Sequence, residues 1–288
     1  MSTDYPDHRL AIVGAGVMGT NISALATGYG LRVVLVDVSD AVLAEARKVI
    51  RGKLRHAQLM GALPPERPLG DLVTTTSLDD VADATTVVEA VTEVAEVKAK
   101  VLAGLSAVVR PGTTLISNTS CIPVSEMAES VARPGELVGV HFMNPSYLIK
   151  MVEVIRGPAT SEATMTAVTG LLTALGREAL VVNDSAGFVI NRLLHPLINT
   201  AARLVEEGVA SAEVVDGLLE GCLGHATGPL RTADLIGLDN LVDSLNVLYE
   251  RRADESCRPC ELLLGKVREG NLGRKTGRGF YDYGKVAS

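Results

Sequence analysis

The sequence predicts an α/β protein in which a doubly wound, mostly parallel sheet is followed by a smaller all-helical domain. Three observations support this prediction. Short β-branched runs alternate with helix-patterned stretches through the first two thirds of the chain. A glycine-rich turn joins the first strand to the first helix, and the strand signal fades near Asp184. Because strands that alternate with helices build crossover units, we expect helices on both faces of the sheet.

The alternation can be followed element by element. Strands are expected at 10–13, 32–37, 72–76, 85–91, 113–117, 136–142 and 151–155, and helices at 17–30 and 94–109. The proline-rich turn "GALPPERP" at 61–68 interrupts the pattern and predicts a helical projection near 40–70. Apolar residues at helical spacing then predict helices at 187–208, 211–222, 238–252 and 259–270. The expected domains are therefore 1–184 and 185–288.

Composition limits the possible functions. The chain has 27 Lys and Arg against 34 Asp and Glu, a net charge of −7, and no basic block. Neither nucleic acid nor an anionic membrane is therefore an expected partner. The start, "MSTDYPDHRLAIVGAG", lacks the pattern of a secretory signal, and no apolar run has the length of a membrane span. Four scattered cysteines fit a reducing compartment, and no metal-ligand spacing appears. We expect a cytoplasmic protein that acts on small molecules.

The turn after the first strand carries Gly14, Gly16 and Gly19 in the spacing GxGxxG. Between a strand and a helix, the first glycine makes a tight turn, the second lets backbone approach a pyrophosphate, and the third allows close helix packing. The next strand ends at Asp37, about 20 residues on, where a carboxylate accepts hydrogen bonds from ribose hydroxyls and repels a 2′-phosphate. The pattern predicts a Rossmann-type domain that binds NAD in preference to NADP. The alternative is a set of glycines that only turn the chain and an aspartate that only caps a helix.

Polar residues follow three later strands. Glu89 and Glu93 follow one strand, the run 117–120 follows the next, and His141 ends a third. In a doubly wound sheet, ligands bind outside these carboxyl ends. A neutral imidazole can remove a proton from an alcohol near pH 7, and a carboxylate can fix its tautomer; Glu153, twelve positions on, is the nearest candidate in sequence. Taken alone, the spacing favours the alternative of a structural histidine and a solvent-facing glutamate.

Several separated motifs together resemble the 3-hydroxyacyl-CoA dehydrogenase family. Besides the glycine turn, they are "NTS" at 118–120, "HFMNP" at 141–145, "KMVEVI" at 150–155, "GFVINRLL" at 187–194, "TGPLRTADLIGLD" at 227–239 and "GRKTGRGFYDY" at 273–283. They stand in the family's order and spacing from about Leu10 to Tyr283. The resemblance implies an NAD-binding domain, a helical domain that supplies most of a homodimer interface, and NAD-dependent oxidation of a short 3-hydroxyacyl thioester.

The resemblance also implies roles for individual residues. His141 matches the family's catalytic base and Glu153 the glutamate that orients it. Ser120 and Asn191 match the groups that hydrogen-bond the substrate oxygen. The positions near the nicotinamide are matched by Glu93, Lys98 and Asn144. On this hypothesis, the base takes the 3-hydroxyl proton while hydride passes to NAD.

Three segments depart from the family pattern. They are Met143 with the following "SYLIK", the shortened turn "MGALPPERP", and Arg231, where many relatives are acidic. These departures look similar to a branch of the family found with polyketide assembly, which oxidises a hydroxyacyl group, such as glyceryl, on an acyl carrier protein. An acidic carrier would need a basic surface, and the candidates are Arg47, Lys48, Arg51, Lys53 and Arg55. Those five residues are equally compatible with an ordinary solvated helix face. Coenzyme A and a carrier protein thus stand as two hypotheses for the group that carries the substrate.

Two other functions are compatible with a glycine turn of this kind. One is a protein that binds NAD(H) without turnover, which the joint presence of His141, Glu153 and the two substrate-binding positions disfavours. The other is a dehydrogenase of small 3-hydroxyacids. That family is known for a catalytic lysine at the entrance to the helical domain, where this chain has "DSAGFVINRLL" without a lysine.

Overall fold

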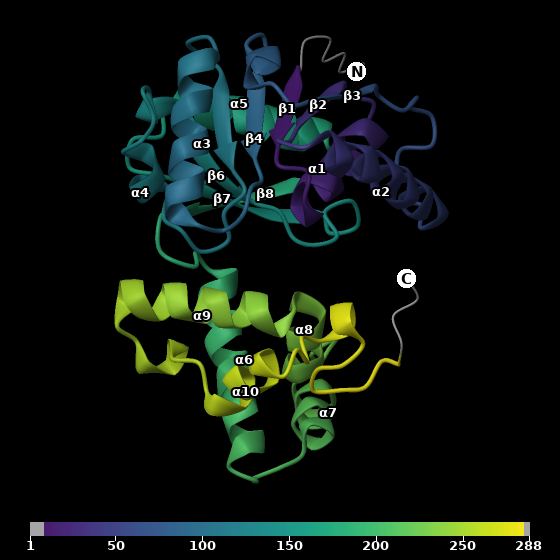
Figure 1. Ribbon diagram of the computed structural model, residues 1–288, viewed down its shortest axis with the longest axis vertical. Helices are drawn as coiled ribbons and strands as arrows, with labels where there is room; N and C mark the ends of the chain where they lie inside the picture. The colour runs from purple at the N-terminus through teal and green to yellow at the C-terminus, as the bar shows by residue number, and fades with distance from the viewer. Residues whose placement is uncertain (1–8, 285–288) are drawn as a thin grey trace. The chain divides into compact units, whose positions relative to one another are not determined.

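The computed structural model describes residues 9–284, and the chain divides into two compact units that meet between Ser185 and Ala186 (Figure 1). The first eight residues, on which part of the secretory-signal argument depends, lie outside the described residues. Within the described range, no helix combines the length and the apolarity that crossing a membrane requires.

The first unit is built on an eight-stranded sheet with the order β3-β2-β1-β4-β5-β6-β7-β8. All neighbouring strands are parallel except β6 and β7, which are antiparallel. The prediction of a doubly wound, mostly parallel sheet is confirmed. The strands are β1 Leu10–Val13, β2 Val33–Val36, β3 Leu72–Thr75, β4 Thr86–Glu89, β5 Thr114–Ser117, β6 Leu137–His141, β7 Met151–Arg156 and β8 Glu178–Asn183.

Helices cover both faces of this sheet, which is why its central strands are largely apolar and are buried along their whole length. The helices are α1 Val17–Gly28, α2 Asp40–Leu59, α3 Ala95–Val108, α4 Val124–Ala128 and α5 Glu162–Ala174. Ile22 of α1, Ile50 of α2 and Leu172 of α5 share one core with Ile12 of β1. On the other face, α3 and α4 lie together, and Val124 of α4 packs against β6 (Figure 1).

The proline-rich turn after α2 packs back onto the first unit. A Cβ on Gly28, the last residue of α1, would lie 2.6 Å from a Leu63 methyl group. Arg67 donates a hydrogen bond of 3.0 Å to the carbonyl of Tyr29. These contacts fix the path from the end of α2 to β3 and explain why the turn carries a leucine and an arginine among its prolines.

The second unit is helical, as the sequence predicts. Its helices are α6 Ile190–Glu206, α7 Ala212–Leu223, α8 Pro229–Ile236, α9 Leu238–Arg252 and α10 Glu261–Arg268. Two buried aspartates tie its last segment to the helices. Asp216 accepts hydrogen bonds from the Leu230 N–H and the Tyr281 hydroxyl, and Asp234 accepts from the N–H groups of Phe280 and Tyr281.

Arg231, which departs from the family pattern, belongs to this anchoring arrangement. Its guanidinium stacks on the Tyr281 ring, 4.1 Å from the ring centre, and its backbone N–H donates to Asp216. Cation–π stacking and the nearby carboxylate hold the arginine within the second unit. The departure at this position is therefore explained by packing of the chain's final segment.

Candidate active site

The glycine turn has the geometry of a dinucleotide site. Gly14 has a φ of +102°, and a Cβ there would lie 2.6 Å from the Ala90 carbonyl oxygen. A Cβ on Gly19 would lie 1.7 Å from the Gly14 carbonyl oxygen, so only glycine permits this approach of α1 to the turn. Gly16, by contrast, is exposed and has open space where a Cβ would stand. Two glycines are thus required by packing, and the third leaves room at the N-terminus of α1 for a phosphate group.

Asp37 lies directly after β2, next to this turn. Its Oδ2 accepts a hydrogen bond of 2.8 Å from the Ala15 N–H, and the Gly14 N–H donates to the Val36 carbonyl oxygen. Both bonds join the turn to the end of β2. The carboxylate is therefore held beside the position where the adenosine ribose of a dinucleotide lies in folds of this type.

His141 is the last residue of β6, and Glu153 lies on β7 directly opposite to it in the antiparallel register. The His141 Nδ1 and the Glu153 Oε2 are 2.8 Å apart, and both side chains are buried. Because an ionised carboxylate only accepts hydrogen bonds, Nδ1 must carry the hydrogen, which makes Nε2 the basic nitrogen of the ring. The structure thus brings these two predicted residues together.

Ser120 lies in a short loop, 118–121, that follows β5. Glu93 bonds to this loop through one oxygen: its Oε1 accepts from the Thr119 hydroxyl at 2.6 Å, the Ser120 N–H at 2.7 Å and the Cys121 N–H at 2.9 Å. Burial would raise the pKa of Glu93, but the ammonium of Lys98 and these hydrogen bonds outweigh it and hold that pKa below its ordinary value. Glu93 is therefore ionised at neutral pH.

Lys98 lies on α3 and is completely buried. Its ammonium is 2.8 Å from Glu89 Oε1, 3.2 Å from Glu93 Oε2 and 3.4 Å from the Val91 carbonyl oxygen. The contacts with Glu89 and with the Val91 carbonyl oxygen are hydrogen bonds that the ammonium donates, and the contact with Glu93 is an ion pair. Lys98 thus joins the two glutamates that follow β4.

Asn118 connects the same loop to the strand that carries the histidine. Its side-chain oxygen accepts a hydrogen bond of 3.2 Å from the N–H of Phe142, the residue after His141. Its own N–H donates to the Glu89 carbonyl oxygen at 2.8 Å. The ends of β4, β5 and β6 are therefore joined by direct hydrogen bonds beside His141.

The remaining predicted residues lie in different places. Asn144 accepts a hydrogen bond of 3.1 Å from the side-chain amide of Asn21 on α1, so it lies beside the helix that follows the glycine turn. Asn191 lies in the first turn of α6, in the second unit. Within residues 9–284, no group of three or more metal-ligating side chains is gathered.

Three of the five basic residues near α2 have partners within the first unit. Arg47 donates to the Thr74 hydroxyl, Lys48 pairs with Glu45, and Lys53 donates to the Thr20 hydroxyl at 3.0 Å. Burial lowers the pKa of Lys53 to about 8. Lys53 is half-buried, while Arg47, Lys48, Arg51 and Arg55 remain exposed on α2.

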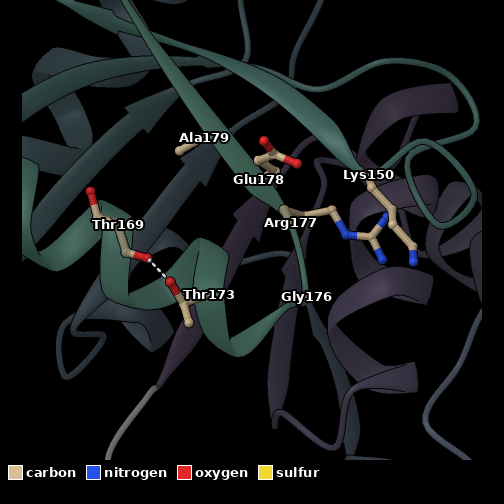
Figure 2. A pocket seen from close by; sticks show the side chains of 7 residues that line it. All are labelled: Lys150, Thr169, Thr173, Gly176, Arg177, Glu178 and Ala179. Atoms are coloured by element: carbon tan, nitrogen blue, oxygen red, sulfur yellow. Dashed lines mark hydrogen bonds between the residues drawn. The ribbon is translucent and has the colours of Figure 1, made fainter.

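A surface hollow near the start of β8 lies apart from these residues. Figure 2 shows its lining, in which Arg177 extends from the strand toward Lys150. The Arg177 guanidinium donates to the carbonyl oxygens of Ser146 and Ile149 at 3.0 Å and 2.9 Å. Arg177 therefore supports the segment after "HFMNP", and none of the predicted site residues lines this hollow.

Sequence reasoning gave no role to Glu89 or Asn118 beyond their position after a strand. A signal for Glu89 was present, because a charged residue ends the buried run 86–89 and a buried charge needs a partner. The partner is Lys98, nine residues later in the chain. The distance in sequence between the two residues does not indicate that the Lys98 side chain points into the protein toward Glu89. The hydrogen bond from the Phe142 N–H to Asn118 joins residues that are 24 positions apart, and neither sequence motif predicts it.

Comparison with known families and proteins gives one consistent result. Residues 9–185 match the model of the 3-hydroxyacyl-CoA dehydrogenase NAD-binding domain, and residues 187–283 match the model of the same family's C-terminal domain. A probable 3-hydroxybutyryl-CoA dehydrogenase of Deinococcus radiodurans is 41% identical over 277 residues, covering 96% of this chain and 100% of the relative. A 3-hydroxybutyryl-CoA dehydrogenase of Bradyrhizobium diazoefficiens is 40% identical, covering 96% and 95%.

Solved structures agree with the relatives found by sequence. The crystal structure of FadB2 from Mycobacterium tuberculosis matches with a TM-score of 0.92 at 37% identity, covering 96% of this chain and 100% of the other. The (S)-3-hydroxybutyryl-CoA dehydrogenase of Ralstonia eutropha matches with a TM-score of 0.87 at 38% identity, covering 96% and 99%.

Proposed function

This chain belongs to the 3-hydroxyacyl-CoA dehydrogenase family and is an NAD-dependent oxidoreductase, and we propose that it interconverts a short 3-hydroxyacyl thioester and its 3-oxoacyl form through His141. The observation that carries this proposal is the buried pair of His141 and Glu153 at the end of β6, next to the Ser120 loop. Such a pair supplies a base with a fixed tautomer.

The proposed chemistry is a proton transfer coupled to hydride transfer. In the oxidative direction, Nε2 of His141 takes the proton of the 3-hydroxyl group, and Glu153 stabilises the imidazolium that forms. In the reductive direction, the same imidazolium returns its proton to the forming alkoxide. Bound NAD supplies the acceptor of the hydride that leaves the carbon. Ser120 and Asn191 are proposed to hydrogen-bond the substrate oxygens and hold the reacting carbon in line.

NAD is proposed to lie along the turn that contains Gly14, Gly16 and Gly19. The open space at Gly16 fits a pyrophosphate, and the Asp37 carboxylate fits a ribose that bears no 2′-phosphate. At the nicotinamide end, Glu93 and Asn144 are proposed to line the site. Because Lys98 is completely buried, we propose that it acts on this end through its ion pair with Glu93.

Coenzyme A is the proposed carrier of the acyl group, since the relatives named above are 3-hydroxybutyryl-CoA dehydrogenases. The test is NADH consumption with acetoacetyl-CoA, run beside the same acyl group on an acyl carrier protein. We expect efficient turnover of the coenzyme A ester. Turnover on the carrier alone would replace coenzyme A by a carrier protein in this proposal, and turnover of neither would contradict the proposed reaction.

We also propose that the protein is a homodimer through its second unit. Neighbouring helices α6 and α7 expose apolar side chains on common faces, Leu197 and Leu204 on the first, Val214 and Leu218 on the second. Apolar patches of this kind on a helical surface are typical of protein interfaces. A cytoplasmic location is proposed as well, because the four cysteines are free thiols, three of them buried.

A further inference from the structure

A single carboxylate oxygen organises the loop that carries Ser120. Oε1 of Glu93 accepts three hydrogen bonds from that loop, and two of them come from the consecutive backbone N–H groups of Ser120 and Cys121. Hydrogen bonds to an ionised acceptor are shorter and stronger than those between neutral groups. The three distances, between 2.6 and 2.9 Å, lie in the range of such charge-assisted bonds.

The other oxygen of Glu93 faces the buried ammonium of Lys98, and Glu89 completes the arrangement. Glu89 is fully buried: its Oε1 accepts from Lys98 and from the Val91 N–H, both at 2.8 Å, and its Oε2 accepts from the Ser117 hydroxyl at 2.6 Å. Each oxygen of Glu89 and Glu93 thus faces a hydrogen-bond donor or the ammonium of Lys98. Glu89 and Lys98 are completely buried and Glu93 is partly buried, so these contacts hold the Glu93 carboxylate from within the unit.

We propose that Glu93 is a positioning residue that fixes the loop 118–121, and with it Ser120, while Glu89 and Lys98 keep its carboxylate directed at that loop. This inference rests on the proposed function, in which Ser120 hydrogen-bonds the substrate oxygen. It also assigns a role to Glu89, which supports Glu93 through Lys98 and so acts indirectly on the position of Ser120. It further gives Glu93 a second use beside the proposed cofactor contact, because Oε1 bonds to the loop.

The same network reaches the base. Asn118, at the start of the loop, accepts a hydrogen bond from the Phe142 N–H, and its own backbone N–H donates to the Glu89 carbonyl oxygen. A shift of the loop therefore changes the position of Ser120 relative to His141. Errors of about 1 Å in the placement of catalytic groups can cost on the order of a hundredfold in rate.

Glu93→Gln is the informative substitution, because the shape is kept and the charge is lost. If the glutamine oxygen faces the loop, its amide N–H₂ faces the Lys98 ammonium. If the amide is reversed, its N–H₂ faces three donors of the loop. Either orientation puts donors against donors, so the loop loses its acceptor or Lys98 loses its partner.

The experiment is a double-mutant cycle on the full chain with Glu93→Gln, Ser120→Ala and both together, using acetoacetyl-CoA and NADH. We expect Glu93→Gln to lower kcat about tenfold or more relative to the wild type. In the Ser120→Ala background, the same substitution should lower kcat by less than about twofold. The Kd of NADH, measured by fluorescence for every variant, separates any loss of cofactor binding at Glu93 from the effect on kcat. A fully additive cycle would overturn the inference.

Glu136→Gln is the matched control. Like Glu93, Glu136 joins a backbone N–H of a loop to a basic side chain, but at the other end of the sheet. It accepts hydrogen bonds from the Gly112 N–H at 2.6 Å and from Arg133 at 2.7 Å. This control should lose stability and keep its kcat within about twofold. If Glu136→Gln lowered kcat as much as Glu93→Gln does, a general loss of rigidity would explain both effects and the inference would fail.

Hydrogen exchange supplies a readout that does not require turnover. In Glu93→Gln, the amides of Ser120 and Cys121 should exchange at least about tenfold faster, and the Gly112 amide should be unchanged; Glu136→Gln should give the opposite pattern. If the wild-type protein did not turn over acetoacetyl-CoA, the proposed function would fail. The exchange data would still test whether Glu93 holds the loop 118–121. If turnover were normal and exchange at 120–121 did not change in Glu93→Gln, the inference alone would fail.

Discussion

His141 and Glu153 face each other across the antiparallel pair β6 and β7, with 2.8 Å between Nδ1 and Oε2. The relationship depends on the one antiparallel pairing in the described sheet. If β7 were parallel to β6, a short loop could not bring it back alongside His141, because parallel neighbours need a long crossover connection. Because both residues lie on paired strands, the backbone ladder that ends at this pair holds the hydrogen bond, which is a rigid way to fix the tautomer of a base.

Replacing His141 with glutamine should remove the base and leave the cofactor site intact. Glutamine can hydrogen-bond to Glu153, but it cannot take a proton from an alcohol at neutral pH. We expect kcat to fall about 10³-fold, with the Kd of NADH unchanged within about twofold. Steady-state rates and NADH fluorescence measure these quantities. His225→Gln is the control, since His225 is exposed in the second unit; full activity of His141→Gln would exclude His141 as the base.

Glu153→Gln tests whether the charge opposite His141 matters beyond geometry. A carboxamide oxygen can still accept the Nδ1–H hydrogen bond, but it gives less stabilisation to an imidazolium. The expected loss in kcat for the oxidative direction is about 10²-fold or more. A variant with near-wild-type kcat would mean that orientation alone accounts for the role of Glu153.

The two glycines Gly16 and Gly19 should respond differently to alanine. At Gly16 a methyl group meets no protein atom within 4 Å, so the melting temperature should stay within about 2 °C while the Kd of NADH rises about tenfold. At Gly19 the methyl group would meet the Gly14 carbonyl oxygen at 1.7 Å, so unfolding free energy should fall by about 3 kcal/mol. Thermal melts and NADH titration separate the outcomes; weak NADH binding without any loss of stability in Gly19→Ala would contradict the packing argument.

Lys53 should titrate near pH 8. Burial lowers its pKa to about 8 in the folded protein, whereas an unfolded chain holds this proton up to the ordinary lysine pKa of 10.5. Between these values the unfolded state binds more protons, so the contribution of Lys53 to stability becomes more favourable as pH rises. Reductive ¹³C-methylation and NMR give the pKa directly, with the exposed Lys48 as the internal reference. The stability of the wild type relative to Lys53→Met should rise across the same interval, and a Lys53 pKa equal to that of Lys48 would refute both expectations.

Leu218→Glu should dissociate the proposed dimer. Leu218 is 55% exposed on α7, and a buried carboxylate there would lack a partner within an apolar interface. Light scattering coupled to size exclusion should give the mass of one 30.2 kDa chain for the variant and twice that mass for the wild type. Leu59→Glu, an exposed apolar site in the first unit, should leave the mass unchanged. A monomeric wild type would contradict the proposed dimer outright.

Much of the fold follows from local sequence. The change from strand–helix alternation to helical spacing near Asp184 predicts the division into units, because periodicity is a property of neighbouring residues. The glycine turn and Asp37 likewise carry their own geometry: a positive φ at Gly14 and a strand end at Val36 are set within a few residues. The family resemblance placed His141 and Glu153 in their proposed roles, while their spacing alone left a structural histidine as an alternative.

Sequence alone therefore determined the fold class, the dinucleotide turn and the identity of the candidate base. Tertiary structure decided which side chains meet. It turned Lys98 inward to Glu89 and Glu93, directed Glu93 at the Ser120 loop, and brought Arg47 to the Thr74 hydroxyl. The physical reason is that such contacts depend on strand order and helix rotation across the whole sheet, and no pattern of neighbouring residues encodes which distant charge will compensate a buried one.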